Sequence, residues 1–141
     1  MPNPKLKSQY KVHIVEDNEL YARVLKKALT DEKIQAKVFH NGTDFISSLH
    51  EKPDIVTLDY TLPDMTGKDI LKKIQEVQPE THVIVISAQD SIDTAIELMK
   101  YGAYDYIMKA PDTREKLIHI INNIYKVDQL ESENLILKDA V

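Results

Sequence analysis

Residues 82–87 of this chain read His-Val-Ile-Val-Ile-Ser, and this stretch decides the fold. Four β-branched residues in succession favour a β-strand, because their side chains pack well on a pleated surface. A strand without polar alternation is typical of one that is covered on both faces, as in a parallel sheet. The run therefore predicts a buried strand between layers of helices.

Strand and helix signals alternate five times along the chain. Apolar strand runs lie at residues 12–15, 36–39, 54–58, 82–87 and 104–108. Helical spacing of apolar residues follows each run, at residues 18–29, 43–49, 70–77 and 91–100 and from Asp112 onward. In the first helix the apolar stripe is expected at Leu20, Val24, Leu25 and Leu29. Such βα repeats with short links predict a parallel sheet, whose ligands bind beyond the carboxyl ends of the strands.

The composition limits the class of protein. A chain of 141 residues is long enough for one domain, and its net charge of −5 argues against non-specific nucleic-acid binding. It has no cysteine for disulfides or thiolate metal sites, and no Gly-rich phosphate loop. No apolar run approaches the roughly 18 residues of a membrane span. Residues 1–9 are polar and are expected to be a flexible segment without a signal peptide, so we expect a soluble cytoplasmic protein.

Acidic side chains stand at the ends of two predicted strands. Glu16 and Asp17 follow the first strand, and Asp59 comes directly after the third run. Each has a simpler interpretation, because Asp17 can cap the first helix and Asp59 can be a solvated turn residue. If the strands are neighbours, however, the three carboxylates meet at one edge and repel one another unless a cation neutralises them. Mg²⁺ binds through a few carboxylates and waters, so the pattern predicts a metal site at which a carboxylate can accept a phosphoryl group.

Two further polar residues lie at the ends of the fourth and fifth strands. Ser87 either caps the next turn or donates its hydroxyl to a phosphoryl oxygen, and the small Ala88 leaves room for such a group. Lys109 is either an exposed surface lysine or, beside Asp59, a point charge that pairs with a phosphoryl oxygen. These residues add a hydroxyl and an ammonium group to the same edge of the sheet.

Five motifs carry these residues in a fixed order along the chain. They are Glu16-Asp17, Leu58-Asp59, Leu-Pro-Asp-Met-Thr-Gly at 62–67, Ile86-Ser87-Ala88 and Gly-Ala-Tyr-Asp-Tyr-Ile-Met-Lys at 102–109. As a set, over residues 10 to 125, they resemble the receiver domain of two-component response regulators. The resemblance implies an α/β, flavodoxin-like, doubly wound sheet of five parallel strands in the order 2-1-3-4-5, with five helices of which the last is extended.

The resemblance also implies the roles of the polar residues. Asp59 would accept a phosphoryl group from a histidine kinase or a phosphotransfer protein, and Ser87 and Lys109 would bind its oxygens. Tyr106 would be an aromatic switch that swings inward as Ser87 moves toward the phosphoryl group. Such a protein is a signalling module and not an enzyme, apart from self-phosphorylation and slow self-dephosphorylation.

The same resemblance implies a metal cofactor, Mg²⁺ or Mn²⁺. Its ligands would be the carboxylates of Glu16, Asp17 and Asp59 and the backbone carbonyl of Thr61. An alternative is a phosphatase of the haloacid-dehalogenase type, which also uses an aspartyl nucleophile at a strand end. Those enzymes need a second Asp two residues further on as general acid, and this chain has Thr61 there.

The chain departs from the receiver pattern directly after Lys109. The family usually has a proline there, joined by a cis peptide, whereas here Ala110 follows and Pro111 comes one position later. A cis bond to a residue other than proline costs roughly 3 kcal/mol. We nevertheless expect the Lys109–Ala110 bond to be cis.

Near the end of the chain, five residues that could form the seam of a coiled coil are spaced alternately by three and four positions. These are Val127, Leu130, Asn134, Leu137 and Val141. An a/d pattern with Asn at an a position is typical of a two-stranded parallel coiled coil. In this frame Lys126 faces Glu131 of the partner helix, and Glu133 faces Lys138, so both pairs have opposite charges. We expect a homodimer through residues 127–141; the simpler interpretation is a solvated helix end, because two heptads are short for a coiled coil.

The expected organisation is therefore a segment at 1–9, a receiver domain at 10–126 and a helical, coiled-coil-like linker at 127–141. A receiver with such an extension resembles those of transcriptional regulators that activate sigma-54 polymerase, whose output domains lie outside this sequence. One alternative is a free-standing receiver that signals by protein–protein contact. Another is a structural coiled-coil adaptor with an inert receiver fold. No direct nucleic-acid or membrane contact of this chain is expected.

Overall fold

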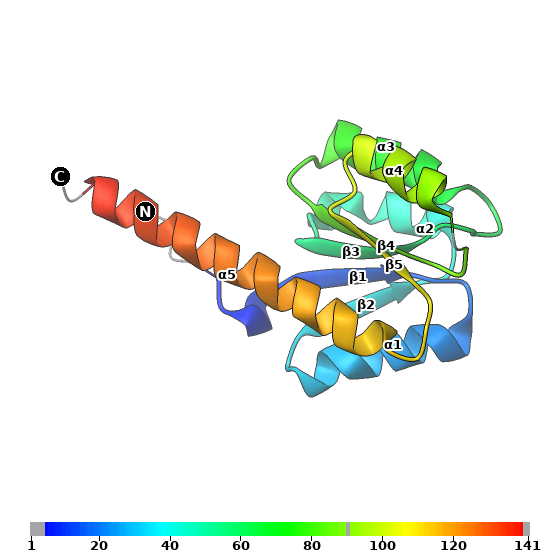
Figure 1. Ribbon diagram of the computed structural model, residues 1–141, viewed down its shortest axis with the longest axis horizontal. Coiled ribbons are helices and arrows are strands. Elements are labelled where there is room, and N and C mark those ends of the chain that lie inside the picture. The colour runs from blue at the N-terminus through cyan, green and yellow to red at the C-terminus, as the bar shows by residue number, and fades with distance from the viewer. Residues whose placement is uncertain (1–4, 90, 140–141) are drawn as a thin grey trace.

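The computed structural model describes residues 5–89 and 91–139, and it confirms the five-stranded parallel sheet (Figure 1). The strands are β1 (Lys11–Val15), β2 (Gln35–Phe39), β3 (Ile55–Asp59), β4 (His82–Ser87) and β5 (Asp105–Met108). They pair in the order β2-β1-β3-β4-β5, and every neighbouring pair is parallel. The flavodoxin-like order that the resemblance implied is therefore present.

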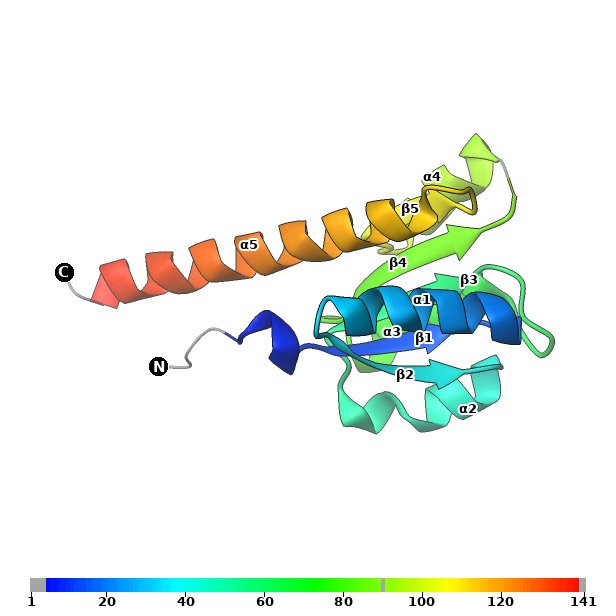
Figure 2. The same cartoon turned by 90° about the horizontal axis from the view of Figure 1, so that it is seen from below.

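Five α-helices connect and cover the strands. They are α1 (Glu19–Asp31), α2 (Gly42–Ser47), α3 (Gly67–Val77), α4 (Ile92–Lys100) and α5 (Thr113–Asp139). Two short 3-10 turns, η1 (Lys7–Gln9) and η2 (Leu49–Glu51), precede β1 and follow α2. Helices α1 and α5 lie on one face of the sheet, and α2, α3 and α4 lie on the other (Figures 1 and 2).

The two helical layers explain why β4 has no polar alternation. Ile84 and Ile86 point into the core beneath α1 and α5, whereas Val83 and Val85 point into the core beneath α2, α3 and α4. Successive side chains of a strand point to opposite faces, so a strand covered on both faces needs apolar residues at every position.

The apolar stripe of α1 differs from the sequence-based expectation. The buried residues of the helix are Ala22, Leu25 and Leu29. Leu20 is 73% exposed and Val24 is 41% exposed, so the prediction that they face the core was wrong. Residues 22, 25 and 29 follow one another at spacings of three and four and face the sheet. The neighbouring apolar positions lie outside that face.

Short polar side chains fix the starts of four helices. Asn18, Asn41, Thr66 and Ser91 each accept a hydrogen bond from the backbone N–H three residues further on, which satisfies a free donor of the first turn. After α4 the backbone reverses at Gly102, whose φ of +99° favours glycine. These local signals set the lengths of the connections that lead to the carboxyl edge of the sheet.

Residues 5–10 lie against the extended part of α5 and are called the N-terminal clasp below (Figure 2). Tyr10 is buried, and its hydroxyl donates to the carboxylate of Asp128 while its ring packs edge-on against Tyr125. Lys7 Nζ donates to Asn122 Oδ1 at 2.9 Å. Helix α5 therefore contacts the N-terminal clasp in addition to the sheet.

Helix α5 runs without interruption across position 126, the boundary expected between receiver and linker. Of the segment expected at 1–9, residues 1–4 lie outside the described residues, and residues 7–9 form η1. In the part of the chain that the structure describes, no helix is both long and apolar enough to cross a lipid bilayer.

Candidate functional site

Three carboxylates meet at the carboxyl edge of the sheet. Asp59 is the last residue of β3, and Glu16 and Asp17 directly follow the neighbouring strand β1. One oxygen of each side chain lies within 4.8 Å of the others. Glu16 and Asp59 are buried, whereas Asp17 is exposed. The structure thus brings together the three acids that the sequence predicted to be neighbours.

The ammonium group of Lys109 joins this acidic cluster from the end of β5. Its Nζ lies 2.7 Å from Oε1 of Glu16 and 3.6 Å from Oδ2 of Asp59. The remaining oxygen of Asp59, Oδ1, accepts the backbone N–H of Thr61 at 3.2 Å. Oε2 of Glu16 accepts the N–H of Asn18 at 3.1 Å, so both buried carboxylates are held in fixed orientations.

The pKa values at this cluster show that its negative charge is only partly compensated. Burial, followed by the hydrogen bond and the charge of Glu16, raises the pKa of Asp59 from 3.8 to about 7, and the charge of Lys109 and the N–H of Thr61 offset only a smaller part of this rise. Burial by itself would lower the pKa of Lys109, but the hydrogen bond to Glu16 and the charge of Asp59 outweigh this effect and raise it. Asp59 therefore favours a bound cation in addition to Lys109.

The chemistry of the acidic cluster fits a hard divalent cation. Carboxylate oxygens are the ligands that Mg²⁺ and Mn²⁺ prefer, and Glu16, Asp17 and Asp59 offer one oxygen each within a small volume. A cation there would also remove the repulsion that raises the pKa of Asp59.

Ser87 lies one strand further along the same edge. It is the last residue of β4, and its Oγ accepts the N–H of Gln89 at 3.0 Å. Its carbonyl accepts the backbone N–H of Lys109 at 2.7 Å, which ties the end of β4 to the start of the loop after β5. Because Asp59 pairs with Ile86, Ser87 extends one residue beyond the acid on the adjacent strand.

Tyr106 lies in β5 and contacts the segment after β4 instead of the acids. Its hydroxyl donates to the carbonyl of Gln89 at 2.8 Å, and its ring is half-buried. The carbonyl of Gln89 therefore accepts a hydrogen bond from the Tyr106 hydroxyl, and its N–H donates to Oγ of Ser87. This places the two residues expected to form a switch on the two sides of one peptide segment.

The expectation of a cis peptide after Lys109 was wrong. The Lys109–Ala110 bond is trans, as are all peptide bonds in the described residues. The physical reason is the cost of roughly 3 kcal/mol for a cis bond to alanine, which proline would reduce to under about 1 kcal/mol. The N–H of Ala110, which a proline would lack, donates to Oγ1 of Thr113 at 2.8 Å. Lys109 still reaches the acidic cluster from this backbone.

The loop after Asp59 is held by two residues of the motif at 62–67. Asp64 accepts hydrogen bonds from the hydroxyl of Thr43 and from the N–H groups of Gly42 at 2.9 Å and Thr43 at 2.8 Å, and these bonds, the hydroxyl's first, lower its pKa to about 2. Gly67 donates its N–H to the carbonyl of Tyr60 at 2.7 Å. A Cβ at Gly67 would lie 2.9 Å from Cα of Tyr60, which explains the glycine.

Tyr21 contacts the site but was missed in the sequence. The Nζ of Lys109 lies 4.5 Å from the centroid of the Tyr21 ring. The signal that was available is its position in the first turn of α1, a helix that begins two residues after Asp17.

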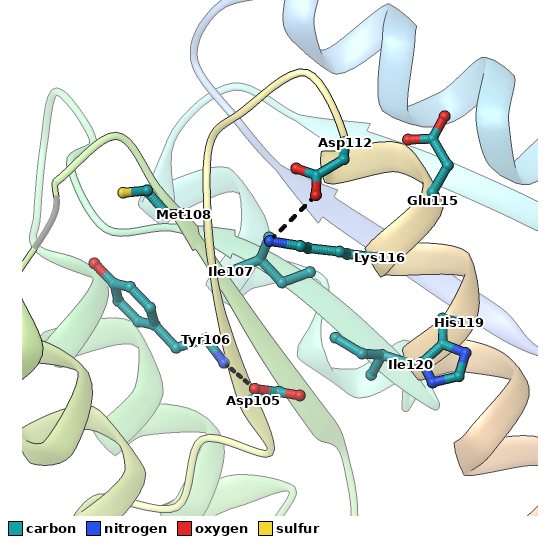
Figure 3. A pocket seen from close by; sticks show the side chains of 9 residues that line it. All are labelled: Asp105, Tyr106, Ile107, Met108, Asp112, Glu115, Lys116, His119 and Ile120. Carbon is teal, nitrogen blue, oxygen red and sulfur yellow. Dashed lines mark hydrogen bonds and ion pairs between the residues drawn. The ribbon is translucent and has the colours of Figure 1, made fainter.

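A hollow of about 460 Å³ lies away from the acids, between β5 and α5 (Figure 3). Lys116 pairs with Asp112 at its rim, at 3.4 Å, while Tyr106 points away from α5. Its floor includes Ile107 and Ile120. It contains none of the acids that the sequence singled out.

The seam residues expected on the last helix are only partly described. Val127 and Leu130 are exposed, at 47% and 59%, and Asn134 is also exposed. The side chain of Leu137 and the whole of Val141 lie outside the described residues. The described part of the seam is thus available to a partner.

Comparisons with known proteins agree with this geometry. The model of the response regulator receiver domain matches residues 12–122. The luminescence regulatory protein LuxO of Vibrio campbellii is 36% identical over 121 residues, which cover 85% of this chain and 27% of that protein. An NtrX-like response regulator of Rickettsia conorii is 38% identical over 137 residues, which cover 95% of this chain and 29% of that protein.

A solved structure shows the same fold. The signal receiver domain of a protein described as a LuxO repressor, from Vibrio parahaemolyticus, has a TM-score of 0.80 and 32% identity, covering 87% of this chain and 95% of that one. The present chain spans less than a third of the length of the two sequence relatives. Receiver domains are signalling modules rather than conventional enzymes. The matched region, the strand order and the acidic edge together place this chain in the family of response regulator receiver domains.

Proposed function

We propose that Asp59 is the phosphoacceptor of a two-component system. The observation that carries the proposal is the position of its buried carboxylate between two further acids and the Lys109 ammonium. A carboxylate oxygen of Asp59 would attack the phosphorus of a phosphohistidine on a kinase or phosphotransfer protein. The phosphorus–nitrogen bond then breaks, and the donor histidine keeps the electron pair and takes up a proton.

The carboxylates of Glu16, Asp17 and Asp59, with the backbone carbonyl of Thr61, are proposed to hold Mg²⁺ or Mn²⁺. When bound, the metal would neutralise negative charge on the incoming phosphoryl oxygens. Glu16 and Asp59 are oriented for this by the N–H groups of Asn18 and Thr61. The exposed Asp17 leaves the remaining side of the site open to solvent and to a donor.

Ser87 and Lys109 are proposed to bind the phosphoryl oxygens. An aspartyl phosphate adds up to about two negative charges, and a conformation is favoured only by contacts that differ between the two states. The Ser87 hydroxyl accepts the N–H of Gln89 and still has its own hydrogen to donate, and a movement of Ser87 toward a phosphoryl oxygen would draw it away from that N–H. Tyr106 is bonded to the same Gln89, so this movement would free the tyrosine to turn inward.

The acceptor can be tested with a small phosphoramidate donor in the presence of Mg²⁺. Intact mass spectrometry should show the gain of one phosphoryl group on the wild type and none on Asp59→Asn. Asp105→Asn is a matched control, because Asp105 lies at the start of β5, away from the acidic edge. Equal labelling of wild type and Asp59→Asn would contradict the assignment.

We further propose that the phosphorylated domain controls transcription through an output domain outside residues 1–141, in a regulator of the sigma-54 type. The relatives named LuxO and NtrX-like support this proposal, since each is more than three times as long as the aligned region. A homodimer through the seam of α5 would connect phosphorylation of the receiver domain to the output domain. Val127 and Leu130 support it because apolar side chains that are exposed along one line favour a partner.

Analytical ultracentrifugation tests the dimer. Leu130→Asp should shift the chain toward the monomer, because it places like charges across an apolar seam. Ser132→Asp is a matched control, because it adds the same charge to α5 at a position outside the seam and outside the predicted charge pairs. Association that is unchanged in Leu130→Asp would exclude α5 as the interface. In that case a free-standing receiver that signals through other contacts becomes the better explanation.

A further inference from the structure

We propose that Tyr21 is a positioning residue of the phosphoacceptor site, and that its ring face holds the ammonium group of Lys109 within reach of Asp59. The inference rests on the proposed role of Asp59. It adds to the site a residue that belongs to none of the five sequence motifs.

The geometry is that of a cation–π pair. Nζ of Lys109 lies 4.5 Å from the ring centroid, inside the roughly 6 Å range of this interaction. The backbone of Tyr21 is fixed, because its N–H donates to Oδ1 of the capping residue Asn18 at 2.9 Å. The ring also packs against the core beneath α1 and α5, so its position does not depend on Lys109.

The hydroxyl of Tyr21 does not explain why an aromatic residue stands here. It is buried and has no hydrogen-bond partner among the described residues. An unpaired buried hydroxyl is unfavourable. The ring face toward Lys109 is thus the contact that links Tyr21 to the site.

A lysine in this position needs a support that does not depend on the acids. Its side chain has a flexible four-carbon stem, and its resting partners are the carboxylates of Glu16 and Asp59. If a divalent cation takes up both carboxylates, their attraction for the ammonium falls. The quadrupole of the Tyr21 ring is unchanged by that event, so the ammonium stays above the acceptor until phosphoryl oxygens arrive.

Two substitutions separate the ring from the hydroxyl. Tyr21→Phe keeps the ring, and Tyr21→Leu keeps apolar bulk without it. With saturating Mg²⁺ and a phosphoramidate donor, timed intact-mass measurements should give Tyr21→Phe a labelling rate within about twofold of wild type, and Tyr21→Leu a rate about three- to tenfold lower. Tyr21→Met replaces Tyr21→Leu if the leucine variant does not fold.

A second readout detects the contact itself and is not moved by a merely structural role. In NMR spectra the ε-methylene protons of Lys109 should be shifted upfield by the ring in wild type and Tyr21→Phe, and should lose this shift in Tyr21→Leu. Tyr101→Leu is a matched control. It removes a ring from beneath Lys68 and Lys72, each 4.9 Å from its centroid, and should leave the labelling rate unchanged.

Three outcomes would overturn the inference: wild-type labelling by Tyr21→Leu, unshifted Lys109 resonances in the wild type, or a Tyr21→Phe variant as slow as Tyr21→Leu. A wild-type chain that accepts no phosphoryl group would instead overturn the proposed role of Asp59. The Lys109 resonances would still decide the contact with Tyr21 in that case.

Discussion

The ammonium of Lys109 is paired at 2.7 Å with Oε1 of Glu16, a carboxylate whose side chain is only 3% exposed. The proposed acceptor, Asp59, is further from it, at 3.6 Å. The resting lysine is thus held mainly by a proposed metal ligand. It has to exchange partners before it can contact a phosphoryl group on Asp59.

Glu16→Gln should weaken Mg²⁺ binding by about tenfold or more, because it removes one of three carboxylates and keeps the shape of the side chain. Isothermal titration calorimetry measures the change in Kd. Glu19→Gln is the matched control, since Glu19 lies in the first turn of α1 and carries the same charge outside the acidic cluster. Equal weakening by both substitutions would mean that overall charge, and not ligation, sets the affinity.

Without a divalent metal, Asp59→Asn should stabilise the fold at neutral and alkaline pH. Burial, followed by the hydrogen bond and charge of Glu16, raises the pKa of Asp59 to about 7. Between about pH 4 and pH 7 the folded state holds a proton that the unfolded state has released. The free energy of unfolding of the wild type therefore falls with rising pH across this window and stays low above it.

Asparagine does not ionise, so the variant escapes this loss. We expect a gain of about 1–3 kcal/mol at about pH 8 and a smaller gain at about pH 5. Urea denaturation at both pH values measures the difference, with the exposed Asp31→Asn as control. A gain that does not vary with pH would show that ionisation of Asp59 is not its cause.

Tyr10→Phe should loosen the N-terminal clasp. It removes a hydroxyl that donates to the carboxylate of Asp128 from a buried position, and a hydrogen bond to a charged group contributes about 1.5–3 kcal/mol. Hydrogen exchange should become faster in α5 near Asn122 to Gln129, where the clasp makes its contacts. Tyr104→Phe is the control because Tyr104 is 40% exposed. Unchanged exchange in Tyr10→Phe would mean that the clasp does not restrain the helix.

Gly67→Ala should cost about 1–3 kcal/mol and slow phosphorylation, since the new Cβ would lie 2.9 Å from Cα of Tyr60 in the loop that follows Asp59. Gly42→Ala should cost less. Its Cβ would meet the side chain of Met65, at 2.5 Å, and a side chain can move where backbone cannot. Thermal denaturation compares the two variants, and an equal loss would contradict the difference between side-chain and backbone contacts.

The sheet and its acidic edge were predictable from local patterns. Each strand is a short apolar run, and Glu16, Asp59, Ser87 and Lys109 follow or end such runs, so the parallel sheet brings their elements to one edge. The faces of the helices were less predictable. Leu20 is apolar yet exposed, because it lies outside the face of α1 that Ala22, Leu25 and Leu29 bury against the sheet.

Contacts between residues far apart in the chain were not predictable. Tyr10 and Asp128 are separated by 118 positions, and no periodic pattern connects them. The trans bond after Lys109 was missed for a different reason. The family pattern favours a cis bond at this position, but a cis bond to alanine costs roughly 3 kcal/mol, and the local chemistry decides the backbone.

Helix α5 starts beside the acidic edge, because Oγ1 of Thr113 accepts a hydrogen bond from the N–H of Ala110, the residue after Lys109. Its 27 residues extend for about 40 Å. If α5 turns as a rigid rod about its first residue, a tilt of about 5° would move its far end by about 3.5 Å. If the clasp at Asp128 is instead the pivot, the same tilt would move the far end by only about 1.5 Å, and the start of α5 would move in the opposite direction. Residues 5–10 would then set how much of a movement at the acidic edge reaches the far end of α5.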